Sequence, residues 1–129
     1  YAHIGTGNYH SQTAKAYTDM GLLTARPEVT GEVVEVFHYL TGRSLKTDYK
    51  SLLVAPINMK SSFLEMIRQE AEAARAGKPA GIIAKCNNLE DKSVIEALYE
   101  ASQAGVKIDL IVRGFCCLRP GVAGLSETI

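Results

Sequence analysis

The sequence predicts an α/β protein, in which a βαβαβ unit with a parallel sheet and helices on the sheet faces follows a smaller α+β portion. Short apolar runs, typical of buried strands, begin near residues 52, 81 and 107. Segments with helical apolar spacing lie between these runs, and Gly or Pro residues stop them. Because parallel strands need a right-handed crossover that lays a helix on the sheet, this order of elements implies a parallel sheet.

The βαβαβ unit should begin with a strand at Leu52–Ala55, an apolar run that stops at Pro56. Asn58 can cap the helix that follows, and Gly77 and Pro79 stop it. The residues expected on the buried face of this helix are Phe63, Leu64, Ile67, Ala71 and Ala74.

The second cycle starts with a strand at Gly81–Lys85 and a loop at Cys86–Asn88. Asp91 caps the next helix, Gly105 closes it, and a third strand covers Lys107–Val112. The expected buried face of this helix comprises Val94, Leu98 and Ala101.

The α+β portion should contain two strands, Tyr1–Ile4 and Met20–Thr24, and a helix, Val29–Leu40, that ends at Gly42. The expected buried face of the helix comprises Val33, Val36, Phe37 and Leu40. The stretch Thr41–Lys50 is polar and basic, which favours an interdomain linker. We therefore expect one domain to end near residue 50 and the next to begin at residue 51.

Composition narrows the classes of function. The chain has 129 residues, with 14 Lys and Arg against 14 Asp and Glu, so its net charge gives no case for wholesale capture of nucleic acid or membranes. Any anion-binding site must therefore be formed by a few nearby residues and not by the overall charge of the chain. The three Cys residues have neither disulfide-framework nor zinc-site spacing, and no apolar run reaches the roughly 18 residues of a membrane helix. These features favour a soluble, cytoplasmic protein with reduced thiols.

Polar side chains follow two strands of the predicted sheet. Lys85 ends one strand and Asn87 lies in the loop after it, while Arg113 directly follows the next strand. In open α/β sheets ligands bind beyond the carboxyl ends of the strands, and Lys, Asn and Arg there would suit phosphate. The competing interpretation is that Arg113 is a surface salt-bridge partner.

The stretch Gly5-Thr-Gly-Asn8 brackets a hydroxyl between two glycines and precedes an amide. Such a stretch can approach a ligand closely, but a tight turn is the alternative, and neither a dinucleotide fingerprint nor a P-loop is present. His3 precedes it and is the one candidate for direct chemistry, although a lone His beside a strand is usually structural. Tyr17 follows it and can stack on a base or simply pack.

Several longer stretches have unusual composition and together cover the chain nearly end to end: Tyr1-Ala-His-Ile-Gly-Thr-Gly-Asn-Tyr-His, Tyr17-Thr-Asp, Gly21-Leu-Leu-Thr, Tyr39-Leu-Thr-Gly-Arg, Leu52-Leu-Val-Ala-Pro, Ile83-Ala-Lys, Ala97-Leu-Tyr-Glu-Ala-Ser-Gln-Ala-Gly-Val and Leu110-Ile-Val-Arg-Gly. In these stretches the chain resembles the C-terminal half of bacterial polyphosphate kinases. That family is similar to phospholipase D in its C-terminal domains. The resemblance implies that residues 1–50 are the C-terminal part of a first such domain plus the linker, and residues 51–129 the N-terminal part of a second.

The resemblance also implies roles for individual residues. Tyr17 and Arg113 match positions that contact ATP, and Thr6, Gly7 and Asn8 match the second element of the phospholipase D signature, which would support the phosphate site. The phosphorylated histidine of the family belongs to an H-x-K element, which does not occur in the chain and is expected upstream. A second functional histidine is expected beyond Ile129, and the Mg²⁺ ligands are expected upstream.

We therefore expect the full-length protein to transfer phosphate from ATP to polyphosphate through a phosphohistidine, with ATP, ADP and polyphosphate as partners and a homo-oligomeric assembly. The isolated segment is expected to be inactive. Two alternatives stay open: a non-catalytic anion-binding or assembly module, and a phosphodiesterase of the phospholipase D type.

Overall fold

The computed structural model describes all residues from Tyr1 to Ile129, which form two compact units. Unit 1 comprises Tyr1–Asn58 and unit 2 comprises Met59–Ile129. No helix in either unit is both long enough and apolar enough to cross a membrane.

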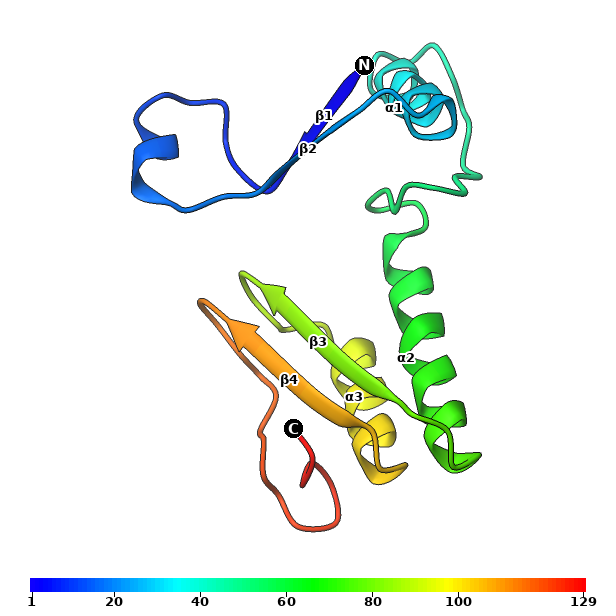
Figure 1. The fold of residues 1–129 in the computed structure, drawn as a ribbon, viewed down its shortest axis with the longest axis vertical. Coiled ribbons are helices and arrows are strands. Elements are labelled where there is room, and N and C mark those ends of the chain that lie inside the picture. The colour runs from blue at the N-terminus through cyan, green and yellow to red at the C-terminus, as the bar shows by residue number, and fades with distance from the viewer. The chain divides into compact units, whose positions relative to one another are not determined.

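Unit 1 begins with an antiparallel hairpin of strands β1, Ala2–Gly5, and β2, Gly21–Thr24 (Figure 1). Gly5 pairs with Gly21 at the end of the hairpin next to its connecting loop. The loop between the strands contains a short 3-10 helix, Thr13–Ala16. Both predicted strands are confirmed, each with its start displaced by one residue.

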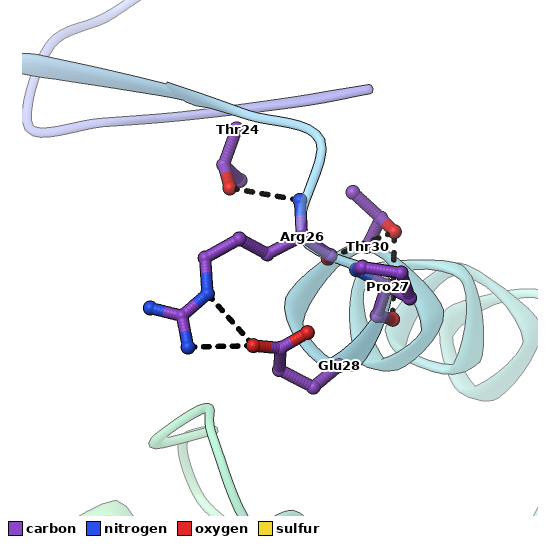
Figure 2. A network of polar contacts seen from close by, with 5 residues as sticks. All are labelled: Thr24, Arg26, Pro27, Glu28 and Thr30. Carbon is purple, nitrogen blue, oxygen red and sulfur yellow. Dashed lines mark hydrogen bonds and ion pairs between the residues drawn. The ribbon is translucent and has the colours of Figure 1, made fainter.

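Helix α1, Pro27–Leu40, follows β2 and confirms the predicted helix with two further residues at its start. Figure 2 shows why it begins there: the Thr24 hydroxyl accepts the backbone N–H of Arg26 at 3.2 Å, and Pro27 supplies a first helical position that needs no N–H partner. The Arg26 guanidinium pairs with Glu28 Oε1 at 2.6 Å. A backbone N–H hydrogen bond and the Arg26 guanidinium hold the pKa of the Glu28 carboxyl below its usual value. The carboxylate in the first turn also complements the helix dipole.

The predicted buried face of α1 is only partly correct. Val33 and Val36 are half-buried, but Phe37 is 62% exposed and Leu40 is 71% exposed. The buried side chain of α1 is instead a carboxylate, Glu32. Helical spacing identifies the apolar side of the helix, but no residue of unit 1 covers the part of that side that carries Phe37 and Leu40.

The Glu32 carboxylate joins α1 to the segment that precedes unit 2. Its Oε1 accepts the backbone N–H of Lys50 at 2.7 Å, and its Oε2 accepts those of Ser51 and Leu52 at 2.9 Å each. Burial acts to raise the pKa of Glu32, but these three hydrogen bonds, helped by nearby Lys46, outweigh it and hold the pKa below the usual 4.5. The segment after the predicted linker is therefore fixed to the helix.

The predicted strand Leu52–Ala55 is wrong, because the structure gives this segment no strand partner. Side chains satisfy its backbone instead. Besides the Glu32 contact, Val54 N–H donates to Asn58 Oδ1 at 2.6 Å, and Leu52 C=O accepts Asn58 Nδ2–H at 3.1 Å. The predicted βαβαβ unit is therefore reduced to a βαβ unit.

Unit 2 contains two parallel strands in one sheet, β3, Gly81–Cys86, and β4, Lys107–Val112 (Figure 1). Helix α3, Lys92–Gln103, forms the crossover between them, and helix α2, Met59–Arg75, packs on α3. All four predicted elements are confirmed. Asp91 caps α3 as predicted, since its carboxylate accepts the backbone N–H of Val94 at 3.2 Å.

The core of unit 2 lies between the helices and one face of the sheet. Ala101, Val106 and Ile108 are almost fully buried, and the predicted core residues Ile67, Ala71 and Leu98 lie in the same cluster. Of the other predicted core residues, Leu64, Ala74 and Val94 are partly buried, whereas Phe63 is 43% exposed.

The second face of the β3–β4 sheet is open. Alternate side chains point to opposite faces of a strand, and on the open face Ile83 is 85% exposed and Ile111 is 61% exposed. The expected cover of helices on the sheet faces is found on one face only, because α2 and α3 both lie on that side of the sheet.

Each of the three helices ends where a Gly was predicted to stop it. Gly42, after α1, has a φ of +71°, and its N–H donates to Tyr39 C=O while Arg43 N–H donates to His38 C=O. This pair of hydrogen bonds satisfies the last carbonyls of the helix and needs a left-handed residue. Gly77 and Gly105 end α2 and α3 in the same conformation.

Two glycines of the α1 region allow a matched test of this backbone constraint. Neither Gly31, inside α1, nor Gly42 has any heavy atom within 4 Å of where a Cβ would lie. We expect Gly31→Ala to raise the free energy of unfolding by about 0.5–1 kcal/mol, because Ala restricts the unfolded chain. Gly42→Ala should lower it by about 1–2 kcal/mol, because its φ is left-handed. Denaturant unfolding measures both, and equal effects would contradict the assignment.

The stabilisation by Glu32 should depend on pH. Because its pKa is lower in the folded chain, its stabilisation is complete above pH 4.5 and is lost as the pH falls through the folded pKa. Glu32→Gln leaves one acceptor oxygen where the carboxylate had two, so the amide protons of Lys50, Ser51 and Leu52 should exchange faster. Each hydrogen bond to a charged group contributes about 1.5–3 kcal/mol.

Hydrogen exchange followed by NMR measures the protection of the Lys50, Ser51 and Leu52 amide protons. Glu35→Gln on the same helix is the control. Glu35 accepts a side-chain hydroxyl of Ser44 and contacts His38, but it holds no backbone N–H. Unchanged protection of the three amides in Glu32→Gln would show that the carboxylate does not hold the segment.

Candidate functional site

The predicted site residues of unit 1 gather around the β1–β2 loop. A depression of about 280 Å³ is lined there by His3, Gly7, Asn8 and Tyr17, together with Asp19 and others. Tyr17 is 51% exposed, so its ring is accessible to a ligand. Four residues singled out in the sequence therefore line one concave surface.

Thr6 closes this loop through its hydroxyl and its backbone. Its Oγ1 donates to Asp19 Oδ1 at 3.0 Å and accepts the backbone N–H of Met20 at 3.0 Å, while its own N–H donates to Met20 C=O at 2.9 Å. The Thr6 hydroxyl is therefore engaged within the loop. It shapes the depression, and it is not among the residues that line it.

Gly7 and Asn8 also have local structural reasons to be in this stretch. A Cβ at Gly7 would lie 2.7 Å from Asp19 Oδ2, which is closer than real Cβ contacts allow. Asn8 Oδ1 accepts the backbone N–H of His10 at 3.0 Å and closes a tight turn. The glycine-rich stretch therefore has the geometry of a compact turn that presents its backbone to the depression.

Asp19 and Tyr9 line the same depression and were not identified from the sequence. Both are engaged with predicted residues: Asp19 with Thr6, and Tyr9 with His3. Asp19 lies 13 residues from Thr6, so no local sequence pattern links the two residues. The only sequence feature that could have indicated their contact is the predicted pair of strands, which brings the two ends of the loop together.

In unit 2 the predicted site residues lie together at the carboxyl edge of the β3–β4 sheet. Lys85 belongs to β3, and the register that pairs Cys86 with Val112 brings Asn87 beside Arg113. The pairing continues past the strands, since Arg113 N–H donates to Cys86 C=O at 3.1 Å and Gly114 N–H donates to Asn87 C=O at 2.7 Å. The backbone thus holds Lys85, Asn87 and Arg113 close to one another.

Asn88, rather than Asn87, uses its side chain to build this edge. Its Oδ1 accepts the backbone N–H of Phe115 at 3.0 Å. A Cβ at Gly114 would lie 2.5 Å from the same oxygen, so a side chain at position 114 would push the Asn88 amide out of its present place. The sequence showed two adjacent Asn residues after one strand and a Gly after the next. It did not show which of the two Asn side chains holds the loop, and the structure identifies Asn88.

The charges near this edge favour the strand ends over the helix start as an anion site. Lys85 is exposed and makes no ion pair within residues 1–129. Helix α3 starts with the Asp91 carboxylate, which already pairs with Lys60 at 2.7 Å. The Lys60 ammonium, together with the Val94 N–H, holds the pKa of Asp91 below its usual value. The negative cap would repel an anion at the helix N-terminus.

Across residues 1–129 the structure brings together no group of three or more His, Cys, Asp or Glu side chains that could hold a metal ion. The three thiols of Cys86, Cys116 and Cys117 are free.

Comparison with known proteins gives the family of the chain. Residues 1–46 match the family described as polyphosphate kinase C-terminal domain 1, and residues 52–129 match polyphosphate kinase C-terminal domain 2. The chain belongs to the polyphosphate kinase family, which confirms the resemblance noted in the sequence.

Relatives match along the whole chain. The polyphosphate kinase of Synechocystis is 56% identical over 129 residues, which are 100% of this chain and 18% of the relative. That of Pseudomonas putida is 54% identical with the same coverage. The crystal structure of polyphosphate kinase from Porphyromonas gingivalis matches 98% of this chain and 21% of its own with a TM-score of 0.89 and 41% identity. The chain thus spans about a fifth of these proteins.

The two asparagines of the β3 loop provide a test of the edge geometry. Asn88→Ala removes the acceptor of Phe115 N–H and should lower the free energy of unfolding by about 0.5–1.5 kcal/mol. It should also speed exchange of the Phe115 amide proton. Asn87→Ala is the matched control, because the Asn87 side chain makes no hydrogen bond within residues 1–129. If both variants behave alike in denaturation and exchange experiments, Asn88 does not organise the loop.

Proposed function

We propose that the chain is part of an enzyme that transfers the terminal phosphate of ATP to polyphosphate through a phosphohistidine, and that it forms part of the nucleotide and polyphosphate site. The observation that carries this proposal is the 56% identity over all 129 residues with a relative named polyphosphate kinase. We further propose that residues 1–50 and 51–129 belong to two successive phospholipase D-like domains, in a cytoplasmic, homo-oligomeric protein.

Arg113 is the residue proposed to bind phosphate in unit 2. A guanidinium offers a planar fork of donors that matches phosphate oxygens, and charge on those oxygens changes during transfer. The backbone of Arg113 is fixed by its hydrogen bond to Cys86 C=O. Lys85 and Asn87 would add a second cation and an amide at the same edge.

Tyr17 is the residue proposed to contact the nucleotide in unit 1. Its half-exposed ring in the depression can pack on a base. Thr6, Gly7 and Asn8 would support the phosphate site indirectly, by holding the loop that shapes this surface.

The phosphate acceptor is proposed to be a histidine of an H-x-K element elsewhere in the full-length protein. Its ring nitrogen would attack the γ-phosphorus of ATP and release ADP, and a terminal oxygen of polyphosphate would then attack the same phosphorus and release the histidine. The covalent intermediate divides the transfer between two long anions into two displacements at one site. Mg²⁺ would neutralise phosphate charge in the full-length enzyme.

The mechanism is tested with the full-length protein and γ-labelled ATP. We expect an acid-labile label on the protein first and labelled long-chain polyphosphate after it, because phosphohistidine is hydrolysed in acid. Hydrolysis or alcoholysis of an added phosphodiester, with no label on protein or polyphosphate, would favour a phosphodiesterase of the phospholipase D type. If neither labelled protein nor labelled polyphosphate appears and no phosphodiester is cleaved, the proposed transfer is contradicted and a non-catalytic anion-binding module is favoured.

The role of Arg113 is tested by polyphosphate binding to the chain at several salt concentrations. Arg113→Ala should weaken binding about tenfold and reduce its dependence on salt, because charge-assisted hydrogen bonds are lost. Arg75→Ala is the control, since Arg75 is an exposed residue at the end of α2. Equal affinities for Arg113→Ala and the unaltered chain would remove Arg113 from the site.

A further inference from the structure

The His3 imidazole lies on a shelf made by two glycines. His3 and Gly5 are two apart in β1, and Gly5 pairs with Gly21 of β2, so all three residues share one face of the hairpin. A Cβ at Gly21 would lie 2.4 Å from His3 Nε2, and a Cβ at Gly5 would lie 3.1 Å from His3 Cε1. The ring therefore occupies the space that side chains at these two positions would fill.

Tyr9 holds the ring from its other edge. The Tyr9 hydroxyl lies 2.5 Å from His3 Nδ1, and the two rings meet edge to face with centroids 5.6 Å apart. His3 Nε2 makes no hydrogen bond within residues 1–129. His3, Tyr9 and Gly21 all line the depression that also contains Tyr17 and Asp19.

We infer that Tyr9 is the positioning residue of His3: its phenol donates to Nδ1, keeps the ring proton on Nε2, and so presents an N–H donor to a phosphate oxygen in the depression. A neutral imidazole has one donor nitrogen and one acceptor nitrogen, and the hydrogen bond at one nitrogen decides which is which. The assignment of a phosphate group to this depression rests on the proposed function.

The neighbouring Asp19 carboxylate is compatible with this arrangement. Its Oδ1 accepts the Thr6 hydroxyl at 3.0 Å, and its Oδ2 faces Gly7. Asp19 therefore faces the loop on the side of Thr6 and Gly7, whereas Nε2 lies over Gly21. The donor from His3 and the acceptors of Asp19 belong to different parts of the depression wall.

The glycine shelf provides a second way to disturb the same contact. Ala at position 21 would place a methyl group where Nε2 now lies, so the ring must move away from its present place and from Tyr9. Because the imidazole is the mobile end of a side chain, the hairpin itself should tolerate the change. Gly21→Ala and Tyr9→Phe should therefore produce similar changes at His3.

NMR of the 129-residue chain with ¹⁵N-labelled histidine rings tests the positioning role. For the neutral His3 ring of the unaltered chain, we expect a protonated Nε2 and a hydrogen-bonded, unprotonated Nδ1. In Tyr9→Phe and in Gly21→Ala the Nδ1 resonance should shift toward that of a solvated ring nitrogen. His10, which contacts Thr13, and His38, which contacts Glu35, serve as internal references.

Tyr39→Phe is the matched control, because it removes a phenol hydroxyl from helix α1 of the same unit and leaves His3 untouched. A proton on Nδ1 in the unaltered chain would overturn the proposal. So would identical His3 resonances in the unaltered chain and in Tyr9→Phe.

Titration with tripolyphosphate separates the positioning role from the proposed function. We expect the His3 Nε2–H resonance to move on addition of tripolyphosphate, with an apparent affinity about three- to tenfold lower in Tyr9→Phe. If Tyr9→Phe changes the His3 nitrogens but tripolyphosphate does not, the positioning role stands and the phosphate assignment of the depression is overturned.

Discussion

A backbone N–H group that is withdrawn from water needs an acceptor, and at three places in this chain a side chain supplies it to a segment outside the strands. Glu32 accepts three such groups from the segment that begins at Lys50, Asn58 accepts one from Val54, and Asn88 accepts one from Phe115. Each of these side chains holds a connecting segment in place through its hydrogen bonds. The two candidate surfaces depend on this kind of contact too, because Thr6 and Asn88 fix the loops that carry the proposed ligand contacts.

Elements with a complete local signal were predicted correctly from the sequence. The β3–α3–β4 unit has an apolar run, an Asp cap, a Gly stop and a second apolar run, and each of these signals acts within a few residues. The segment Leu52–Ala55 has the same apolar composition but is not a strand, since a strand also needs a partner that its own residues do not specify. Likewise, helical spacing placed Phe37 and Phe63 on apolar faces without indicating whether anything covers those faces.

The candidate site was predictable to a similar degree. The rule for strand ends placed Lys85, Asn87 and Arg113 at one sheet edge, and the register of β3 and β4 brings them together there. The same rule could not distinguish Asn87 from Asn88, because adjacent side chains differ in direction rather than in chemistry. Tyr9 and Asp19 were missed because their partners, His3 and Thr6, are 6 and 13 residues away and the contacts depend on how the loop folds back.

The continuation of the β3–β4 pairing beyond Val112 has a thermodynamic consequence for Arg113. Its backbone is part of a hydrogen-bonded ladder, so a ligand does not have to order a flexible loop before it can bind. Fixing one residue's backbone costs roughly 1–2 kcal/mol, and this cost has already been met during folding of unit 2. What remains is the rotamer entropy of one side chain, about 2 kcal/mol at most. For the phosphate site proposed at this edge, the backbone would be preorganised, and the entropic cost of binding would come from ordering the side chains that contact the ligand.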